Sequence, residues 1–267
     1  MATRDFDENS ITAAVIDRFA DVPDPRLKAL LGSLVRHVHD FVRDVDLTEA
    51  EWFGAIDFLT RTGQTCSDTR QEFILLSDTL GISMLVDAIN HRQPDGATET
   101  TVLGPFYVAN PPVQANGTDI AAGNAGAPLF VTGTVTSPAG EPLAGATVDV
   151  WHSDEEGLYD VQKPGGTAQL RARFICDAQG RFAFWTIVPC SYPVPHDGPV
   201  GAMLKASNRH PYRPAHLHFM VAHAGFETLV THLFMAEDPY LDSDAVFGVK
   251  QLSLIHISEP TRLRRIS

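Results

Sequence analysis

The sequence has little cysteine, and its few thiols are poorly arranged for a disulfide framework or a metal cluster. Only three cysteines occur in 267 residues, Cys66, Cys176 and Cys190, and no two have CxxC spacing. Structural zinc sites and disulfide-rich secreted domains need more thiols at closer spacing. We therefore expect neither, and this cysteine usage favours a cytoplasmic protein.

Positive charge and long apolar runs are also scarce. Lysine and arginine number 20 against 33 aspartates and glutamates, a formal net charge of −13, which repels phosphate backbones and anionic membrane surfaces. No uncharged apolar run approaches the roughly 20 residues that span a bilayer, and no secretory signal is visible. We expect neither a nucleic-acid nor a membrane partner. Without a GxGxxG fingerprint, we expect no nicotinamide or flavin cofactor.

The first hundred residues carry the periodicity of helices. Apolar residues recur three and four apart between Leu27 and Val45, which predicts one long helix. Thr48 and Glu51 have the spacing of a capping box that opens a second helix. A third is expected from about Asp68 to Ile89, and Gly81 is the position at which it would break. We predict an N-terminal helical domain over residues 1–100.

From about residue 100 the pattern changes to short alternating runs separated by glycine, proline and asparagine. Such runs are typical of strands in an antiparallel sandwich and do not alternate with helices. The fold class is therefore α+β, mainly β: a helical domain followed by an antiparallel β-sandwich over residues 101–251. A surface loop is expected over residues 110–128. The predicted strands lie within residues 129–137, 146–153, 181–189, 215–222 and 228–236.

The end of the chain has a different character. The run LSLIHISEPTR, residues 252–262, matches residue for residue a translation of a transposase adapter used in preparing sequencing libraries. We interpret residues 252–267 as a non-native tail, and a genuine basic tail is the alternative. An interrupted sandwich would expose apolar surface and lose stability.

The sharpest local motif is His216-Leu217-His218 in a predicted strand. Side chains two apart on a strand leave the same face, so both imidazoles can bind one metal ion; hydrogen bonding of both rings is the alternative. Tyr159 and Tyr192 lie in turn-rich segments, and Arg213 precedes His216 by three residues. Sites often occupy such loops, although a turn-forming tyrosine or a surface arginine is the simpler interpretation of each residue alone.

Taken together, these residues resemble the intradiol ring-cleaving dioxygenases, specifically their hydroxyquinol 1,2-dioxygenase branch. The resemblance spans roughly residues 17–251. It rests on five ordered blocks: TVLGPFY (101–107), GEPLAGATVDVWHSDEEGLYDVQ (140–162), SYPVPHDGPVG (191–201), RHPYRPAHLHF (209–219) and DPYLDSDAVFGVK (238–250).

The resemblance implies one ferric ion, Fe(III), per subunit, bound by Tyr159, Tyr192, His216 and His218. Phenolate is a hard anionic donor and favours iron(III). The resemblance also implies two catalytic residues. Tyr192 would leave the metal and take a substrate proton, and Arg213 would stabilise negative charge on the ring while O2 attacks. The product would be a cis,cis-muconate.

The same resemblance implies a substrate pocket and a small aromatic diol or triol as substrate. Leu75 and Asp78 share a predicted helix face, and Asp78 could accept a hydrogen bond from the third hydroxyl of hydroxyquinol; a solvated helix residue is the alternative. Leu103 departs from members that carry phenylalanine there. The implied pocket residues are Leu75, Asp78, Val102, Leu103, Gly104, Pro105, Phe106, Val194, Pro195, Arg213 and Val246.

Two other functions stay open. A catechol or chlorocatechol 1,2-dioxygenase would use the same chemistry. A non-catalytic transthyretin-like sandwich would explain the glycine-rich opening of the second domain but not the tyrosines, Arg213 and the histidine pair together. The resemblance also implies a homodimer through the N-terminal helices. The stripe from Leu27 to Val45 could serve that interface or pack on the sandwich.

Overall fold

The computed structural model describes residues 4–94, 96–163 and 168–255. Its contacts divide the chain into two compact units, Met1–Arg61 and Thr62–Ser267. The predicted domain boundary near residue 100 stays a prediction. The predicted tail falls mainly on residues 256–267, which lie outside the described part of the chain.

The first unit is helical, as predicted. It contains α1 (Ile11–Asp17), α2 (Pro25–Asp44) and most of α3 (Glu49–Thr65). The capping box at the start of α3 is confirmed, because the Thr48 amide donates to Glu51 Oε2 at 2.9 Å and the Glu51 amide donates to Thr48 Oγ1 at 3.3 Å. The apolar stripe of α2 is exposed in the chain: Leu34 is 59% and Phe41 55% exposed.

The third predicted helix is two helices in the structure. These are α4 (Glu72–Thr79) and α5 (Ile82–Asn90), and the break is at Gly81, whose φ of +73° is a left-handed conformation that glycine adopts without steric cost. Both helices belong to the second unit, which also contains α6 (Pro199–Ala206).

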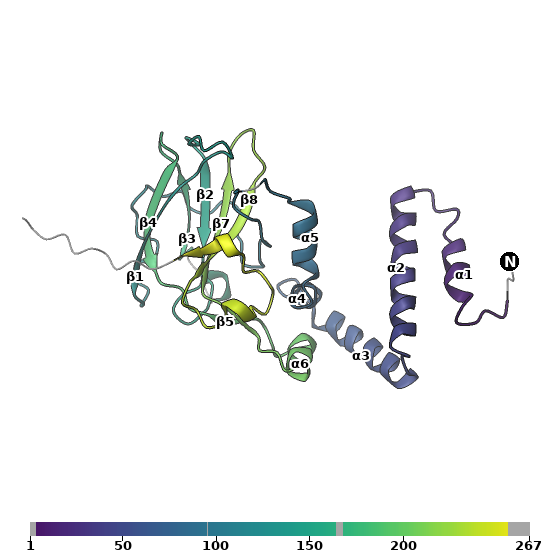
Figure 1. The fold of residues 1–267 in the computed structure, drawn as a ribbon. Helices are drawn as coiled ribbons and strands as arrows, with labels where there is room; N and C mark the ends of the chain where they lie inside the picture. The colour runs from purple at the N-terminus through teal and green to yellow at the C-terminus, as the bar shows by residue number, and fades with distance from the viewer. Residues whose placement is uncertain (1–3, 95, 164–167, 256–267) are drawn as a thin grey trace, which may run out of the picture. The chain divides into compact units, whose positions relative to one another are not determined.

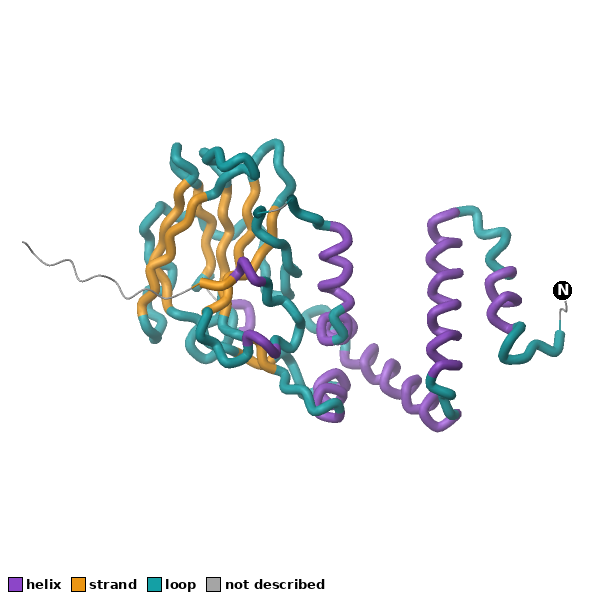
Figure 2. The backbone as a smooth tube through the Cα atoms, viewed as in Figure 1, coloured by secondary structure: helices purple, strands orange, loops and turns teal. Residues whose placement is uncertain are grey.

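The sheets of the second unit form the predicted sandwich (Figures 1 and 2). One sheet pairs β1 (Pro128–Thr134) with β4 (Arg181–Ile187). The other has the order β3-β2-β7-β8-β9. All of its pairs are antiparallel except β8 with β9, which makes this sheet mixed. Its strands are β2 (Thr147–Trp151), β3 (Arg171–Ile175), β7 (His216–Ala222), β8 (Leu229–Met235) and β9 (Leu254–Ile255).

Short elements complete the second unit. β5 (Tyr192–Pro193) and β6 (Tyr212–Arg213) form a two-residue antiparallel ladder. Three 3₁₀ turns occur in the described part of this unit: η1 (Asp160–Gln162), η2 (Leu241–Ser243) and η3 (Gln251–Ser253). The segment 110–128 is mostly loop, as predicted.

The apolar core lies between the two sheets. Phe174 of β3 stacks on Phe184 of β4 with ring centroids 5.1 Å apart, and Leu217 and Phe219 of β7 join the same cluster. Burying each such side chain contributes about 1.5–3 kcal/mol. Because alternate residues of a strand face opposite sides, a core on the side of Leu217 and Phe219 leaves His216 and His218 on the other. No helix among the described residues is long and apolar enough to cross a membrane.

Candidate metal centre

Strand β7 holds the predicted histidine pair on one face. His216 and His218 are both almost completely buried, and their Nε2 atoms are 3.2 Å apart. β7 lies between β2 and β8, and the register places Trp151 and His232 opposite His218. Strand pairing therefore fixes His218 on both sides and His216 on the side of β8.

The two predicted tyrosines reach the same point from other elements. Tyr159 follows a tight turn in which Asp154 Oδ1 accepts from the Leu158 amide at 2.9 Å, and the Tyr159 amide donates to Gln162 Oε1 at 2.9 Å. The Tyr159 hydroxyl is 2.9 Å from His218 Nε2 and 3.2 Å from the hydroxyl of Tyr192. Four donor atoms that are up to 59 residues apart in sequence thus converge.

This donor set fits a metal ion. Donors about 2.1 Å from one centre and at right angles are about 3.0 Å from each other, and the separations above are 2.9–3.2 Å. Burial, with Arg213 nearby, lowers the pKa of His216 to about 3, so its imidazole is neutral and has a lone pair. Burial and the neighbouring Tyr192 raise the pKa of Tyr159 well above its usual value. At this buried position Tyr159 would ionise only beside a strong positive charge. A hard, highly charged metal ion supplies such a charge.

The two histidines are oriented in different ways. His216 Nδ1 donates to the Pro214 carbonyl at 2.7 Å, so the lone pair of the neutral ring is on Nε2, which faces the cluster. His218 Nδ1 has no hydrogen-bond partner among the described residues. Its ring instead stacks on Trp151, with centroids 4.7 Å apart. The backbone of Gly104 packs closely against the His218 ring, because a Cβ at position 104 would lie 3.2 Å from His218 Cε1.

Arg213 lies beside this cluster and is held by Asp244. Arg213 is only 5% exposed; its Nε is 3.2 Å from Asp244 Oδ1 and its Nη2 is 3.4 Å from Oδ2. Burial acts to raise the pKa of Asp244, but Arg213 outweighs that effect and keeps the pKa below its usual value. A paired guanidinium therefore faces His216, at 3.4 Å from its Nε2.

Several of the predicted pocket residues are close together. Leu75, Val194 and Val246 pack in one apolar cluster, and Phe106 stacks on Tyr159 with centroids 4.4 Å apart. Asp78 lies on α4, where burial raises its pKa while Ser83 and Arg213 partly offset the rise. Val102 is half-buried, whereas Leu103, Pro105 and Pro195 are exposed.

Sequence patterns did not single out His232 or Asp244. His232 comes from β8, and one nitrogen from each of His216, His218 and His232 lies within 4.8 Å of the other two. The neighbours of a single histidine in an alternating strand cannot be predicted until the pairing of that strand is known. Asp244 likewise sits in a loop, 31 residues from the arginine that it holds.

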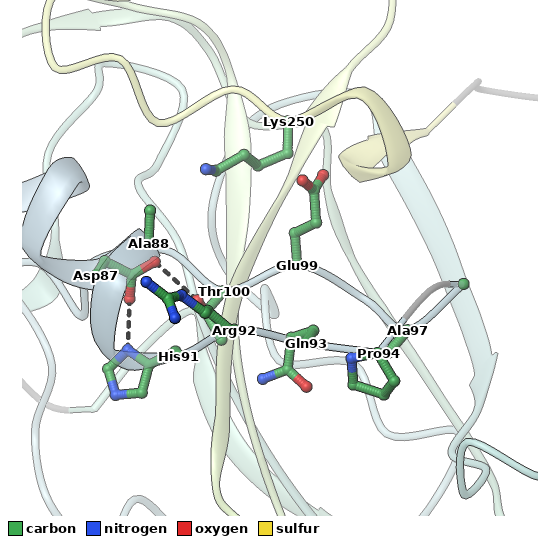
Figure 3. Close-up of a pocket in the computed structure, with 11 residues that line it drawn as sticks. Asp87, Ala88, His91, Arg92, Gln93, Pro94, Ala97, Glu99, Thr100 and Lys250 are labelled. Atoms are coloured by element: carbon green, nitrogen blue, oxygen red, sulfur yellow. Dashed lines mark hydrogen bonds and ion pairs between the residues drawn. The ribbon is translucent and has the colours of Figure 1, made fainter.

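A separate surface pocket of about 310 Å³ lies at the end of α5 (Figure 3). Asp87, His91 and Lys250 are among its lining residues, and none of the predicted site residues is. Asp87 accepts from the Thr100 hydroxyl at 2.7 Å and is 2.9 Å from His91 Nδ1. These contacts fix the pocket wall but bring no further chemistry to the centre.

A helical segment followed by a sandwich in which two buried tyrosines and two buried histidines converge is consistent with a metal-dependent enzyme, and sequence comparison gives its class. Residues 102–261 match the family model described as "Dioxygenase", and residues 24–98 match "Catechol dioxygenase N terminus". The chain belongs to the intradiol ring-cleaving dioxygenases. This membership overturns the alternative of a non-catalytic transthyretin-like module.

Its relatives agree with one another. The chain is 56% identical to the 6-chlorohydroxyquinol 1,2-dioxygenase of Cupriavidus pinatubonensis, over 92% of this chain and 90% of that protein. It is 51% identical to the hydroxyquinol 1,2-dioxygenase of a Rhizobium species, over 92% and 84%. The crystal structure of hydroxyquinol 1,2-dioxygenase from Pseudomonas putida matches with a TM-score of 0.92 and 53% identity, covering 94% of this chain and 88% of that one.

Proposed function

We propose that this enzyme cleaves hydroxyquinol, 1,2,4-trihydroxybenzene, between its two adjacent hydroxyl-bearing carbons. One O2 is consumed and both its atoms enter the product, 3-hydroxy-cis,cis-muconate, the enol form of maleylacetate. The reaction balances without an external reductant. The observation that carries the substrate assignment is the half-buried carboxyl of Asp78 near Arg213 and Asp244, in a chain that is 51% identical to a hydroxyquinol 1,2-dioxygenase.

The proposed cofactor is one ferric ion held by Tyr159, Tyr192, His216 and His218. When bound, it would supply a Lewis acid that binds both adjacent hydroxyl oxygens of the substrate and favours their ionised form. Two phenol oxygens and two neutral imidazoles, buried together, support this choice.

The protein's own groups manage protons and charge. Tyr192, a phenolate in the proposed ligand set, accepts a proton from a substrate hydroxyl at its phenolate oxygen and becomes a neutral phenol. Arg213 is its partner across the β5–β6 ladder, so the guanidinium keeps a fixed position relative to Tyr192. Arg213 then stabilises the negative charge that develops on the ring during attack by O2. Phe106, stacked on Tyr159, keeps water from that side of the site.

Asp78 and the apolar cluster select the substrate. Leu75, Val194 and Val246 form an apolar wall for the ring, and Asp78 accepts a hydrogen bond from the third hydroxyl. Catechol has no such hydroxyl and would leave that carboxyl unpaired. Of the alternative substrates, 6-chlorohydroxyquinol has specific support, because the relative at 56% identity is named for it. It keeps the third hydroxyl, so the role of Asp78 is the same.

We also propose a homodimer in which the exposed apolar stripe of α2 is covered by the second copy. Leu34, Phe41 and their neighbours present an apolar face of several side chains in the first unit. Contiguous exposed apolar surface of this kind marks an interaction site.

The test is ferric loading followed by spectroscopy and turnover. Purified protein loaded with ferric iron should show a visible tyrosinate charge-transfer band and should consume one O2 per hydroxyquinol. Tyr159→Phe should weaken the band and abolish turnover. Tyr107→Phe is the matched control, because Tyr107 donates to Asp149 at 3.2 Å and is not among the proposed ligands. A loaded wild-type protein that lacks the band, or that turns over catechol as fast as hydroxyquinol, would contradict the proposal.

A further inference from the structure

A third histidine, His232, lies beside the proposed metal ligands and has no role in the proposed reaction. It is completely buried on β8. The strand register sets it directly opposite His218, and its ring centroid is 4.1 Å from that of His218 and 5.0 Å from that of His216. A buried polar ring in such a place needs a reason, because burying it without partners costs free energy.

The contacts of its two nitrogens differ. Nδ1 lies 3.4 Å from Nη2 of Arg213. Nε2 makes no hydrogen bond to the described residues. The backbone of Val102 is nevertheless near the ring and acts to raise the pKa of His232. A guanidinium can only donate, so Nδ1 must present its lone pair, and the neutral ring then carries its proton on Nε2. Burial and Arg213 lower the pKa of His232 well below its usual value, in agreement with a neutral ring.

Arg213 thus has support on two sides. Asp244 binds Nε and Nη2 from the loop after β8, and His232 meets Nη2 from the strand itself. Nη1 also lies 3.4 Å from His216 Nε2, but that lone pair is committed to the proposed metal ion, so without His232 the pair with Asp244 would hold the guanidinium alone. The contact with His232 limits tilting about that pair, and it comes from a strand that is also hydrogen-bonded to β7, which carries the proposed ligands His216 and His218.

We infer that His232 is a positioning residue, which fixes the guanidinium of Arg213 relative to the two ligand histidines by accepting a hydrogen bond at Nδ1. This inference rests on the proposed function, in which Arg213 stabilises charge on the substrate ring. His232 acts through Arg213 and does not touch the reacting atoms. It should affect the rate of the oxygen step more than substrate binding.

Three substitutions separate the hydrogen bond from ring packing. His232→Phe keeps a ring against His216 and His218 but has no acceptor. His232→Asn loses the ring but places an amide oxygen the same number of bonds from the backbone as Nδ1. His232→Gln places its amide where Nε2 lies. If packing is what matters, Phe is the better replacement; if the acceptor matters, Asn is better.

The experiment measures iron content, the visible band, anaerobic binding of hydroxyquinol and steady-state turnover for each variant. We expect His232→Phe to lower kcat about 10- to 100-fold, the loss expected when a charged group gives up one hydrogen bond. Its KM, its anaerobic dissociation constant and its iron content should stay near wild type. His232→Asn should recover most of kcat, and His232→Gln should recover less. In an Arg213→Lys background, His232→Phe should have little further effect.

Several outcomes would overturn the inference. One is a ranking in which Phe is as active as wild type or more active than Asn. Another is loss of iron or of the band in His232→Phe, because His232 would then act on the ligands and not on Arg213. If iron-loaded wild-type protein does not turn over hydroxyquinol, the proposed function is wrong. The positioning role of His232 is then tested by crystal structures of wild type and His232→Phe. A displaced guanidinium in His232→Phe supports it, and an unmoved one refutes it.

Discussion

Replacing Asp78 should change which ring the enzyme prefers. Asp78→Asn keeps the size of the side chain and removes its charge, and Asp78→Ala removes the acceptor altogether. In the structure the carboxyl is half-buried on α4, where burial raises its pKa and Ser83 and Arg213 lower it. A group in such surroundings accepts a hydrogen bond from a phenol more strongly than it would in water.

The size of the effect follows from that environment. A hydrogen bond to a charged group contributes about 1.5–3 kcal/mol when buried, which corresponds to about 10- to 100-fold in rate. Because Asp78 is only partly buried, we expect the lower end, about tenfold. Asp78→Asn should lower kcat/KM for hydroxyquinol by that factor and leave kcat/KM for catechol unchanged or raised. Asp78→Ala should shift the ratio in the same direction.

The assay is oxygen uptake with each substrate at saturating ferric iron, and the ratio of the two kcat/KM values is the quantity of interest. Asp87→Asn is the control, since Asp87 is a carboxylate on the neighbouring helix α5 that is more deeply buried than Asp78 and bonds Thr100 and His91 outside the site. Its ratio should stay at the wild-type value. An equal fall for both substrates in Asp78→Asn would show that the residue supports the fold and does not select the substrate.

Three further predictions concern the centre, the pH dependence of stability and assembly. Gly104→Ala should lower iron content more than Gly140→Ala. Both positions have left-handed backbone, which costs about 1–2 kcal/mol for alanine, but only the new Cβ at 104 meets His218; equal iron content would contradict this. Burial lowers the pKa of His152 from 6.5 to about 4, so the unfolded chain binds more protons between those values. The contribution of His152 to the free energy of unfolding should therefore fall by about 3 kcal/mol as the pH drops from 7 to 4. It is measured as the difference between wild type and His152→Asn in urea titrations, because the other buried histidines titrate in both proteins. His152→Asn should flatten that slope, and an unchanged slope would count against the assignment. Leu34→Glu with Phe41→Glu should give monomers by sedimentation, whereas the exposed polar change His37→Glu should not; a wild-type monomer would remove the dimer proposal.

Local signals predicted most of the fold because they act within one element. The capping box at Thr48 and the break at Gly81 depend only on neighbouring residues, and both are confirmed. The predicted strands do not include β3, in which Arg171 and Arg173 interrupt the apolar pattern. In the structure Arg171 is buried and pairs with Asp160, while Arg173 pairs with Asp149 from β2. The sequence does not show which acidic residue will neutralise a buried arginine, so a buried strand that contains arginine lacks the usual apolar pattern.

The site was predictable to a smaller degree from pattern alone. Strand alternation places His216 and His218 on one face, and the register agrees. No periodicity indicates Tyr159 or Tyr192, because each lies in a short irregular segment, and only the family resemblance selected them. His232 and Asp244 depend on strand pairing and on a loop return across 31 residues. Such contacts form only when the chain folds, and no local sequence pattern predicts them.

The two proposed tyrosine ligands are held very differently, in a way that supports their different roles. Tyr159 is 0% exposed, stacks on Phe106 and is fixed by the hydrogen bond of its amide to Gln162. Tyr192 is 8% exposed and forms the two-residue strand β5 with Pro193. The proposed proton acceptor would have to change position, and a side chain that is less completely buried loses less packing when it moves. The pairing of Tyr192 with Arg213 keeps the backbones of the proposed proton acceptor and of the guanidinium in register. The contrast therefore supports the proposal that Tyr192, and not Tyr159, is the proton acceptor.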